Sequence, residues 1–293
     1  MRALSFCLLA LLPACAIAQT TYRMADSLTV CQLLKGAPSD AGTLYFAHRL
    51  MGRPYVAHTL EVNDAERLVV NTRQLDCTTL VETVVALTLC AQNDKHSWDD
   101  YTDMLTRLRY RHGKLDGYAS RLHYFSEWIA DKEHMGLVSD LQQPASLFSA
   151  VQIISVNYMS RHPQAYKALK DNPGLVETIR RHEQQLNGTK VRYIPKQALQ
   201  GNDRLLRENI HDGDIIAITT SKSGLDIAHL GFAVWLDDGL HLLNASQLHK
   251  KVVVEPMTFG QYMQKHPTFT GFRVVRLKGL KREKTENYKS SDI

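Results

Sequence analysis

The sequence lacks an apolar stretch long enough to cross a bilayer. A transmembrane helix needs about 18 uninterrupted apolar residues, and every apolar run after the N-terminus is much shorter. The sequence also has no CxxC pair and no HExxH motif, which argues against a metal site, and we expect no cofactor. The net charge of +5 gives no strong case for nucleic-acid binding, although a weak attraction to anionic cell-wall polymer fits it.

The first 18 residues have the features of a secretory signal peptide. An apolar run over residues 4–12 is followed by small residues that end at Ala18. Leu12–Cys15 also resembles a bacterial lipobox, in which Cys15 would carry a lipid, but Pro13 fits that pattern poorly. We therefore favour cleavage after Ala18 over a lipid anchor, and we expect an exported, periplasmic protein.

Removal of this segment leaves about 275 residues, enough for one large domain or two small ones. The sequence shows no internal repeat, no low-complexity linker and no convincing domain boundary. We predict a single domain over residues 19–277. Residues 278–293 form a charged tail that we expect to be frayed.

The cysteines that remain after cleavage are Cys31, Cys77 and Cys90. An odd number in an oxidising compartment leaves one thiol free or paired between chains. The position of Cys77 at a helix start nominates it as the free thiol. Cys31 and Cys90 could then form a disulfide.

The segment from Leu75 to Leu87 reads as a buried helix with Cys77 in its first turn, because nearly every face of it is apolar. Asp76 or Thr79 can cap its start. With Asp76 as the cap, the Cys77 sulfur lies near unpaired amides and the positive end of the helix dipole, which favours a nucleophilic thiolate. The alternative is a small buried cysteine without chemistry.

Helix patterns precede strand patterns along the chain, which predicts an α+β fold with an antiparallel sheet. The predicted helices cover residues 26–34, 40–51, 75–87, 97–113 and 144–186, the last interrupted at 157–163. The predicted strands cover residues 66–70, 214–219, 230–236, 240–244, 251–255 and 272–277.

His229 is the histidine whose position best suits a base for Cys77. Alternation in its strand places His229, Gly231 and Ala233 on one face, and these small neighbours suit a closely packed helix, for which the cysteine helix is the candidate. On the next strand Asn244 could accept the ring N–H of His229 and fix its tautomer. The alternative is that His229 lies at a strand edge and Asn244 in a turn, without catalytic roles.

A cysteine at a helix start, followed by a histidine and a polar residue on successive antiparallel strands, is the papain-like order. The sequence resembles the N-acetylmuramoyl-L-alanine amidase-like family, an exported branch of the NlpC-type papain-like cell-wall hydrolases. Seven segments carry the resemblance in order along the chain: Gly52–Ala57, Leu75–Glu82, Gly117–Tyr124, Asn157–Pro163, Tyr193–Lys196, Asp212–Ile216 and Leu225–Gly231.

The resemblance implies a papain-like core, with a catalytic helix packed on the antiparallel sheet and a family-specific helical insertion at about residues 97–190. It implies Cys77 as nucleophile, His229 as base and a polar third residue, for which we choose Asn244. The residues expected to bind substrate are Tyr55, Asp76, Arg121, Tyr124, Asn157, Ser160 and Asp226, with Trp128 as a further stacking surface.

The resemblance also implies a substrate, peptidoglycan or muropeptides, and a reaction, hydrolysis of the amide between N-acetylmuramic acid and L-alanine. Cleavage between D-glutamate and the diamino acid of the stem peptide is the alternative bond. A secreted peptidase and a non-catalytic cell-wall binding protein are further alternatives. The presence of both Cys77 and His229 argues against the binding protein, which needs neither.

Overall fold

The computed structural model describes residues 20–201 and 203–279. The expected signal peptide, Cys15 and the charged tail beyond Gly279 lie outside the described residues. Within the described part of the chain, no helix has the length and apolar character needed to cross a membrane.

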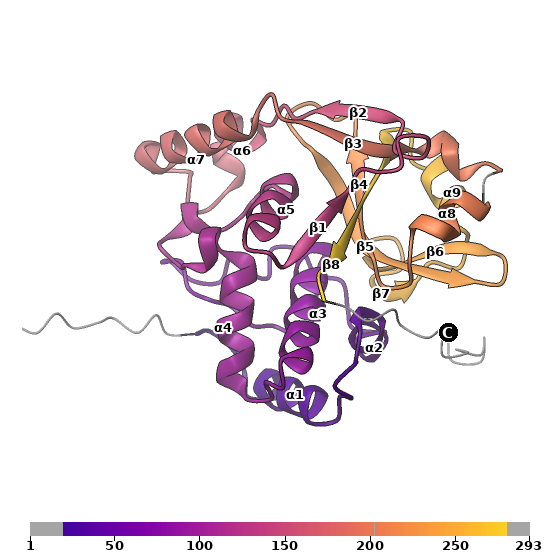
Figure 1. Cartoon of the computed structure of the whole chain (residues 1–293). Helices are drawn as coiled ribbons and strands as arrows, with labels where there is room; N and C mark the ends of the chain where they lie inside the picture. The colour runs from indigo at the N-terminus through magenta and orange to yellow at the C-terminus, as the bar shows by residue number, and fades with distance from the viewer. Residues whose placement is uncertain (1–19, 202, 280–293) are drawn as a thin grey trace, which may run out of the picture.

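Helices dominate the N-terminal half of the fold and strands the C-terminal half (Figure 1). The helices are α1 (Met24–Lys35), α2 (Thr43–Arg49), α3 (Cys77–Gln92), α4 (Trp98–Arg109), α5 (Phe125–His134), α6 (Tyr158–Arg161), α7 (Pro173–Leu186), α8 (Asp203–Asn209) and α9 (Phe259–Gln264). The strands are β1 (Val138–Leu141), β2 (Ala150–Ile153), β3 (Lys190–Pro195), β4 (Ile215–Thr220), β5 (Ile227–Leu236), β6 (Gly239–Ser246), β7 (Lys251–Val254) and β8 (Phe269–Leu277).

The strands form one sheet in the order β2-β3-β8-β4-β5-β6-β7, and β1 pairs with β8 beside this path. Every pairing between these strands is antiparallel. The α+β class with an antiparallel sheet is therefore confirmed. The five strands predicted between residues 214 and 277 are all present, with bounds that differ by a few residues.

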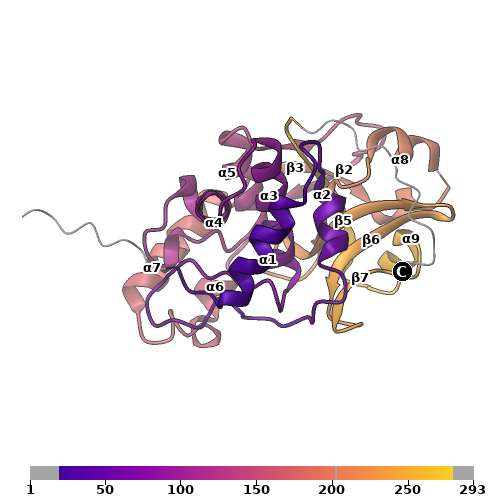
Figure 2. The same ribbon diagram turned by 90° about the horizontal axis from the view of Figure 1, so that it is seen from below.

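The sheet has two buried faces, and each supports its own core. Helices α1 to α4 lie on one side of β5, β6 and β7, and α9 lies on the other (Figure 2). The larger core joins α3 to Leu230, Phe232 and Val234 of β5. The smaller core joins α9 to Ala233 of β5 and Leu242 of β6. Alternation along β5 thus sends neighbouring side chains into different cores.

Helix α3 is the centre of the larger core, and every residue from Thr79 to Ala91 is buried. Its start is closed by a reciprocal cap: the Thr79 N–H donates to Asp76 Oδ1 at 2.8 Å, and the Asp76 N–H donates to Thr79 Oγ1 at 2.9 Å. Asp76 is therefore the N-cap. A salt bridge inside the core, between Glu82 and Arg109 of α4 at 2.7 Å, fixes α3 against α4.

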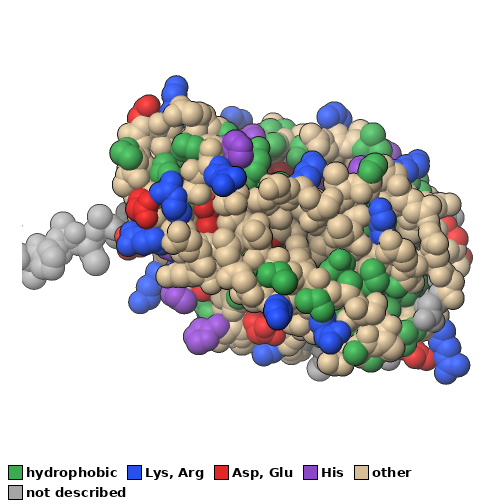
Figure 3. All heavy atoms as spheres, turned by 90° about the horizontal axis from the view of Figure 1, so that it is seen from above, with side chains coloured by type: hydrophobic (Ala, Val, Ile, Leu, Met, Phe, Trp, Pro, Cys, Tyr) green, Lys and Arg blue, Asp and Glu red, His purple; other side chains and the backbone are tan. Residues whose placement is uncertain are grey.

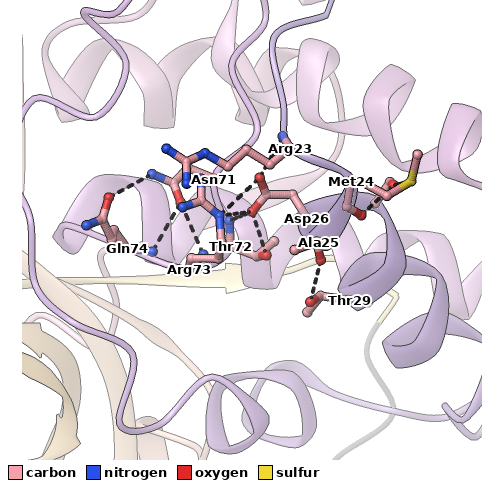
Figure 4. Close-up of polar contacts among 10 residues, drawn as sticks. Arg23, Met24, Ala25, Asp26, Thr29, Asn71, Thr72, Arg73 and Gln74 are labelled. Atoms are coloured by element: carbon pink, nitrogen blue, oxygen red, sulfur yellow. Dashed lines mark hydrogen bonds and ion pairs between the residues drawn. The ribbon is translucent and has the colours of Figure 1, made fainter.

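The first described residues are fastened to the segment that leads into α3. Asp26 of α1 is fully buried, and its carboxylate accepts bonds from the Thr72 N–H at 2.8 Å, Thr72 Oγ1 at 3.0 Å and Arg73 Nε at 3.2 Å (Figure 4). The Thr21 N–H also donates to the Leu68 carbonyl at 2.8 Å. These bonds hold the lead-in to Cys77 in place.

Residues 97–190 are not helical throughout. This segment contributes β1, which pairs with β8, and β2, which pairs with β3. The prediction of helical structure from residue 144 onward was wrong for Ala150–Ile153, because these residues find partners in Lys190–Tyr193 that the local pattern does not show.

The disulfide considered for Cys31 and Cys90 is not formed, and both thiols are free. Cys90 is fully buried in α3 and directs its sulfur toward the Asp100 carbonyl at 3.5 Å. Its surroundings are those of a small apolar core residue.

Seen from above, the surface mixes charges of both signs (Figure 3). Acidic and basic side chains lie side by side at the end of the molecule that carries α6 and α7. This view shows no extended surface of one sign.

The Asp26 contacts generate a test of the fold. Asp26→Ala leaves a buried N–H, a hydroxyl and a guanidinium without their acceptor, so the free energy of unfolding should fall by about 2–4 kcal/mol, measured by urea denaturation. Asp64→Ala is the matched control, because the Asp64 carboxylate is exposed and pairs only with exposed Lys167. Equal stability of both variants would show that Asp26 does not fasten α1.

Candidate functional site

Cys77 is the first residue of α3, and its sulfur meets the start of β5. The backbone of Leu230 and the backbone and side chain of Thr78 lie close enough to the sulfur to favour its ionised form. The side chain is half-buried, whereas the helix from Thr79 to Ala91 is buried. The helix start therefore brings one reachable sulfur to the sheet.

Strand β5 receives the sulfur where it separates from β6. Its pairing with β4 extends to His229 and Ile227, whereas its pairing with β6 covers only Phe232–Leu236. Leu230 pairs with Ala217 of β4 but lies beyond the end of the pairing with β6, and its backbone lies near the Cys77 sulfur.

His229 and Asn244 are brought together across this opening. The register places Asn244 diagonally opposite His229 on the same face, and His229 Nε2 lies 2.9 Å from Asn244 Oδ1. An amide oxygen can only accept, so Nε2 carries the proton and Nδ1 holds the lone pair. This is the tautomer that a base needs if Nδ1 faces the sulfur.

The small residues beside His229 serve a different purpose from the one we expected. A Cβ at Gly231 would lie 2.8 Å from Leu242 Cδ1 and 2.6 Å from the Leu243 carbonyl oxygen. Strand β6 therefore fills that face, and α3 packs against the opposite face of β5. Helix α3 reaches the site with its first turn, not by lying across the small residues.

Glu255, which we did not expect at the site, holds Asn244 in place on the side away from His229. Asn244 Nδ2 donates to Glu255 Oε1 at 2.9 Å, and Glu255 Oε2 lies 3.0 Å from His249 Nε2. Glu255 and Asn244 are both fully buried. In the sequence, only the position of Glu255 at the end of an apolar strand hinted at this contact with Asn244, because a charge buried there needs partners.

The thiol and the imidazole are both held in their neutral forms. Burial, followed by the charge of Asp76, raises the pKa of the Cys77 thiol to about 12, although hydrogen bonds from Leu230 and Thr78 act in the opposite direction. Burial also lowers the pKa of His229, against the hydrogen bond to Asn244 and the charge of Glu255. The expectation of a resting thiolate is therefore wrong: desolvation and the capping carboxylate outweigh the helix start.

Two tyrosines flank the sulfur. Burial raises the pKa of Tyr55, and the nearby Asp76 carboxylate and Cys77 side chain raise it further. Burial likewise raises the pKa of Tyr262 of α9, together with the nearby Glu255 carboxylate and Cys77 side chain. Tyr55 and Asp76 were expected at the site; Tyr262 was not, because its place depends on how α9 packs on the sheet.

Arg121 was expected to bind a substrate carboxylate, but protein carboxylates already occupy it. It is 5% exposed, forms a salt bridge with Glu61, lies 3.7 Å from Glu66 and stacks over the Tyr118 ring at 4.7 Å. A guanidinium paired in this way holds the 60–67 loop in place and is not free for a substrate.

Tyr124 and Ser160 belong to another buried network. Tyr124 Oη donates to Glu183 Oε1 at 2.7 Å and accepts from the Met159 N–H at 3.0 Å, and the Ser160 N–H donates to Glu183 at 3.1 Å. These bonds join α6 to α7. Because of these bonds, Tyr124 and Ser160 help to shape the insertion and do not offer a free polar group to a ligand.

The other residues that were expected to bind substrate also make contacts within the protein. Asp226 is 3% exposed and accepts from the Ser126 N–H at 2.7 Å, so it ties β5 to α5. Trp128 is 1% exposed and stacks on Phe125 inside the core, so it offers no surface to a sugar. Asn157 is half-buried beside Gly224, whose carbonyl accepts the Asn157 N–H at 3.2 Å.

A cavity of about 190 Å³ lies beside this insertion, apart from the Cys77 side chain. Its lining comes from Leu60, Glu61, Asn63, Asp64, Ala65, Glu66, Arg67, Tyr118, Lys167 and Ala168. Among the described residues, no group of three or more His, Cys, Asp or Glu side chains is arranged to hold a metal ion.

The comparisons with known proteins identify the family of the chain. A family model described as AmiA-like, N-acetylmuramoyl-L-alanine amidase-like, matches residues 45–271. No curated protein matches the chain.

Several solved structures are similar. An N-acetylmuramoyl-L-alanine amidase from Bacteroides uniformis shares 43% identity over 84% of this chain and 99% of that chain, with a TM-score of 0.75. A Bacteroides fragilis protein named as a candidate xylanase shares 41% identity over 78% and 98% of the two chains, with a TM-score of 0.73. A Legionella pneumophila protein, 22% identical over 86% and 94%, has a TM-score of 0.64 and supports the fold alone.

Because the family model covers most of the described residues and the Bacteroides uniformis amidase is related over nearly its whole length, the chain belongs to the N-acetylmuramoyl-L-alanine amidase-like family.

Proposed function

We propose that this protein is an exported cysteine amidase that hydrolyses the amide between N-acetylmuramic acid and L-alanine in peptidoglycan or its soluble fragments. The observation that carries the proposal is the meeting of the Cys77 sulfur with the start of β5, next to a His229–Asn244 pair, in a member of this amidase-like family.

Catalysis starts from a neutral pair. His229 takes the Cys77 proton through Nδ1 as the sulfur attacks the amide carbonyl carbon, and a C–S bond forms. The imidazolium then gives its proton to the leaving nitrogen of L-alanine as the C–N bond breaks. Water, deprotonated by His229, hydrolyses the thioester and frees the thiol. Proton transfer and attack are coupled because neither group is ionised at rest.

The start of α3 supplies a donor for the carbonyl oxygen as it becomes negative. Asp76 accepts the Thr79 N–H, and the Thr78 backbone lies next to the sulfur. The Cys77 N–H is then the first-turn amide that we assign to the oxyanion. Its position at the positive end of a helix adds to the stabilisation.

Asn244 keeps His229 in the productive tautomer throughout this cycle. Its oxygen accepts the Nε2 proton in the neutral state and stabilises that N–H when the ring is charged. The order of helix-start cysteine, strand histidine and polar residue on the next strand also supports a papain-like core of the NlpC type.

The chemistry favours acyl transfer over glycoside hydrolysis. A glycosidase of the usual kind needs two carboxyl groups that flank the bond. Here Glu255 is fully buried behind Asn244, and Asp76 caps α3. The xylanase name of the Bacteroides fragilis relative therefore does not suit this site.

The choice of the muramoyl–alanine bond comes from the family, because the three catalytic groups would serve any amide. Cleavage between D-glutamate and the diamino acid remains the competing reaction. The paired Arg121 and the buried Trp128 do not provide the sugar-binding surface that we expected. Tyr55, Asp76 and Tyr262 are the side chains near the sulfur that we propose shape the binding of the substrate.

Mass spectrometry of digested muropeptides tests the proposed reaction. We expect free muramic acid-containing sugar and an intact peptide that begins with L-alanine. Cys77→Ala should lower the rate by at least 10³-fold without loss of folding, because it removes one sulfur atom from a half-buried position. A muramoyl-dipeptide product would support the endopeptidase, and activity within tenfold of wild type in Cys77→Ala would refute the nucleophile.

The neutral pair predicts a specific pH profile. His229 must be uncharged to accept the proton, and burial lowers its pKa, so kcat/KM should rise as pH increases through a midpoint below 6.5. It should stay level toward alkaline pH, because the thiol pKa is about 12. A resting thiolate–imidazolium pair would instead lose activity as the imidazolium deprotonates. A fall above about pH 8.5 would therefore contradict the neutral pair.

A further inference from the structure

Glu255 is a fully buried carboxylate with no part in the mechanism above. Its backbone is fixed from two sides: its N–H donates to the Leu242 carbonyl at 2.9 Å, and its own carbonyl accepts from His241 Nδ1 at 2.8 Å. The side chain extends from the end of β7 toward Asn244 on β6. A buried charge held this firmly needs a reason beyond packing, because its desolvation is costly.

The contacts of Glu255 admit only one orientation of the Asn244 amide. A carboxylate can only accept, so the group 2.9 Å from Glu255 Oε1 must be the NH₂ end of Asn244. The Leu242 carbonyl, 3.4 Å from the same nitrogen, imposes the same orientation. The oxygen end of Asn244 is then the end that faces His229 Nε2.

The orientation of the Asn244 amide in turn determines which ring nitrogen of His229 carries the proton. Resting on the proposed role of His229 as the base, we propose that Glu255 is a positioning residue that fixes the Asn244 amide and thereby keeps the His229 proton on Nε2 and the lone pair on Nδ1. With the amide turned over, its NH₂ would face Nε2, and the proton would move to Nδ1. His229 could then no longer accept from Cys77.

The charge of Glu255 also acts on His229. It favours the imidazolium that forms during attack, together with Asp76, whereas His266 opposes it. The groups that face Glu255 itself are Asn244, His249, Tyr262 and His266. His249 is the outermost of the hydrogen-bonded chain, with 30% of its side chain exposed.

Two substitutions of Glu255 separate its orienting role from its charge. Glu255→Gln keeps an oxygen that can accept from Asn244 but removes the charge. Glu255→Met fills similar space and removes the acceptor. Glu183→Met is the matched control, because Glu183 is a buried carboxylate, 2% exposed, that bonds to Tyr124 and Ser160 instead.

The readout is ¹⁵N NMR of histidine-labelled mature protein, with the His229 signals assigned by their loss in His229→Asn. The wild type, Glu255→Gln and Glu183→Met should show neutral His229 protonated on Nε2, and Glu255→Met should show a mixture of tautomers. In parallel, kcat of Glu255→Met should fall by about 10²-fold with KM unchanged, whereas Glu255→Gln should keep kcat within about tenfold.

Persistence of the single Nε2–H form in Glu255→Met would overturn the proposal, whatever the activity. If Glu255→Met does not fold, the same spectra of Glu255→Leu decide: a mixture of His229 tautomers is expected, and a single Nε2–H form would overturn the proposal. A wild type with the expected tautomers but no amide hydrolysis would contradict the proposed function instead, while leaving the positioning by Glu255 in place.

Discussion

The contact between the first turn of α3 and the open start of β5 is the constraint on which the site depends. The backbone of Leu230 lies next to the Cys77 sulfur, so this contact joins the helical half of the fold to the sheet. The Asp76 cap fixes where the helix begins, and the Asp26 contacts hold the segment before it. On the sheet side, the pairing of β5 with β6 covers only Phe232–Leu236, so Leu230 lies beyond its end.

Two opposing faces of the same strand explain how these parts fit. Leu230, Phe232 and Val234 anchor β5 in the core built on α3, whereas His229 lies on the face that β6, β7 and α9 complete. Cys77 and His229 thus lie on different sides of β5. Burial raises the pKa of the Cys77 thiol and lowers that of the His229 imidazole, which favours the neutral forms on which the proposed coupled proton transfer depends.

Local sequence was enough to predict some of this arrangement. The apolar pattern with Asp76 in front gives the helix start at Cys77, and alternation along two strands gives the shared face of His229 and Asn244. These features depend only on residues close in the chain.

Other features depend on contacts that local sequence does not show. Glu255 and Tyr262 reach the site through the pairing of β7 and the packing of α9. The partners of Arg121 and Tyr124 lie about 60 residues away, so their ion pair and hydrogen bond could not be foreseen. The thiolate expectation failed for the same reason, since it took account of the helix start but not of the burial produced by the whole fold.

The most direct test of the account is a crystal structure of the Cys77→Ser variant with an intact N-acetylmuramoyl-peptide bound. The account predicts that the lactyl carbonyl carbon lies within about 3.5 Å of the serine hydroxyl, with the L-alanine nitrogen toward His229 Nδ1. A peptide amide in that place, or a ligand bound away from the start of α3, would contradict it.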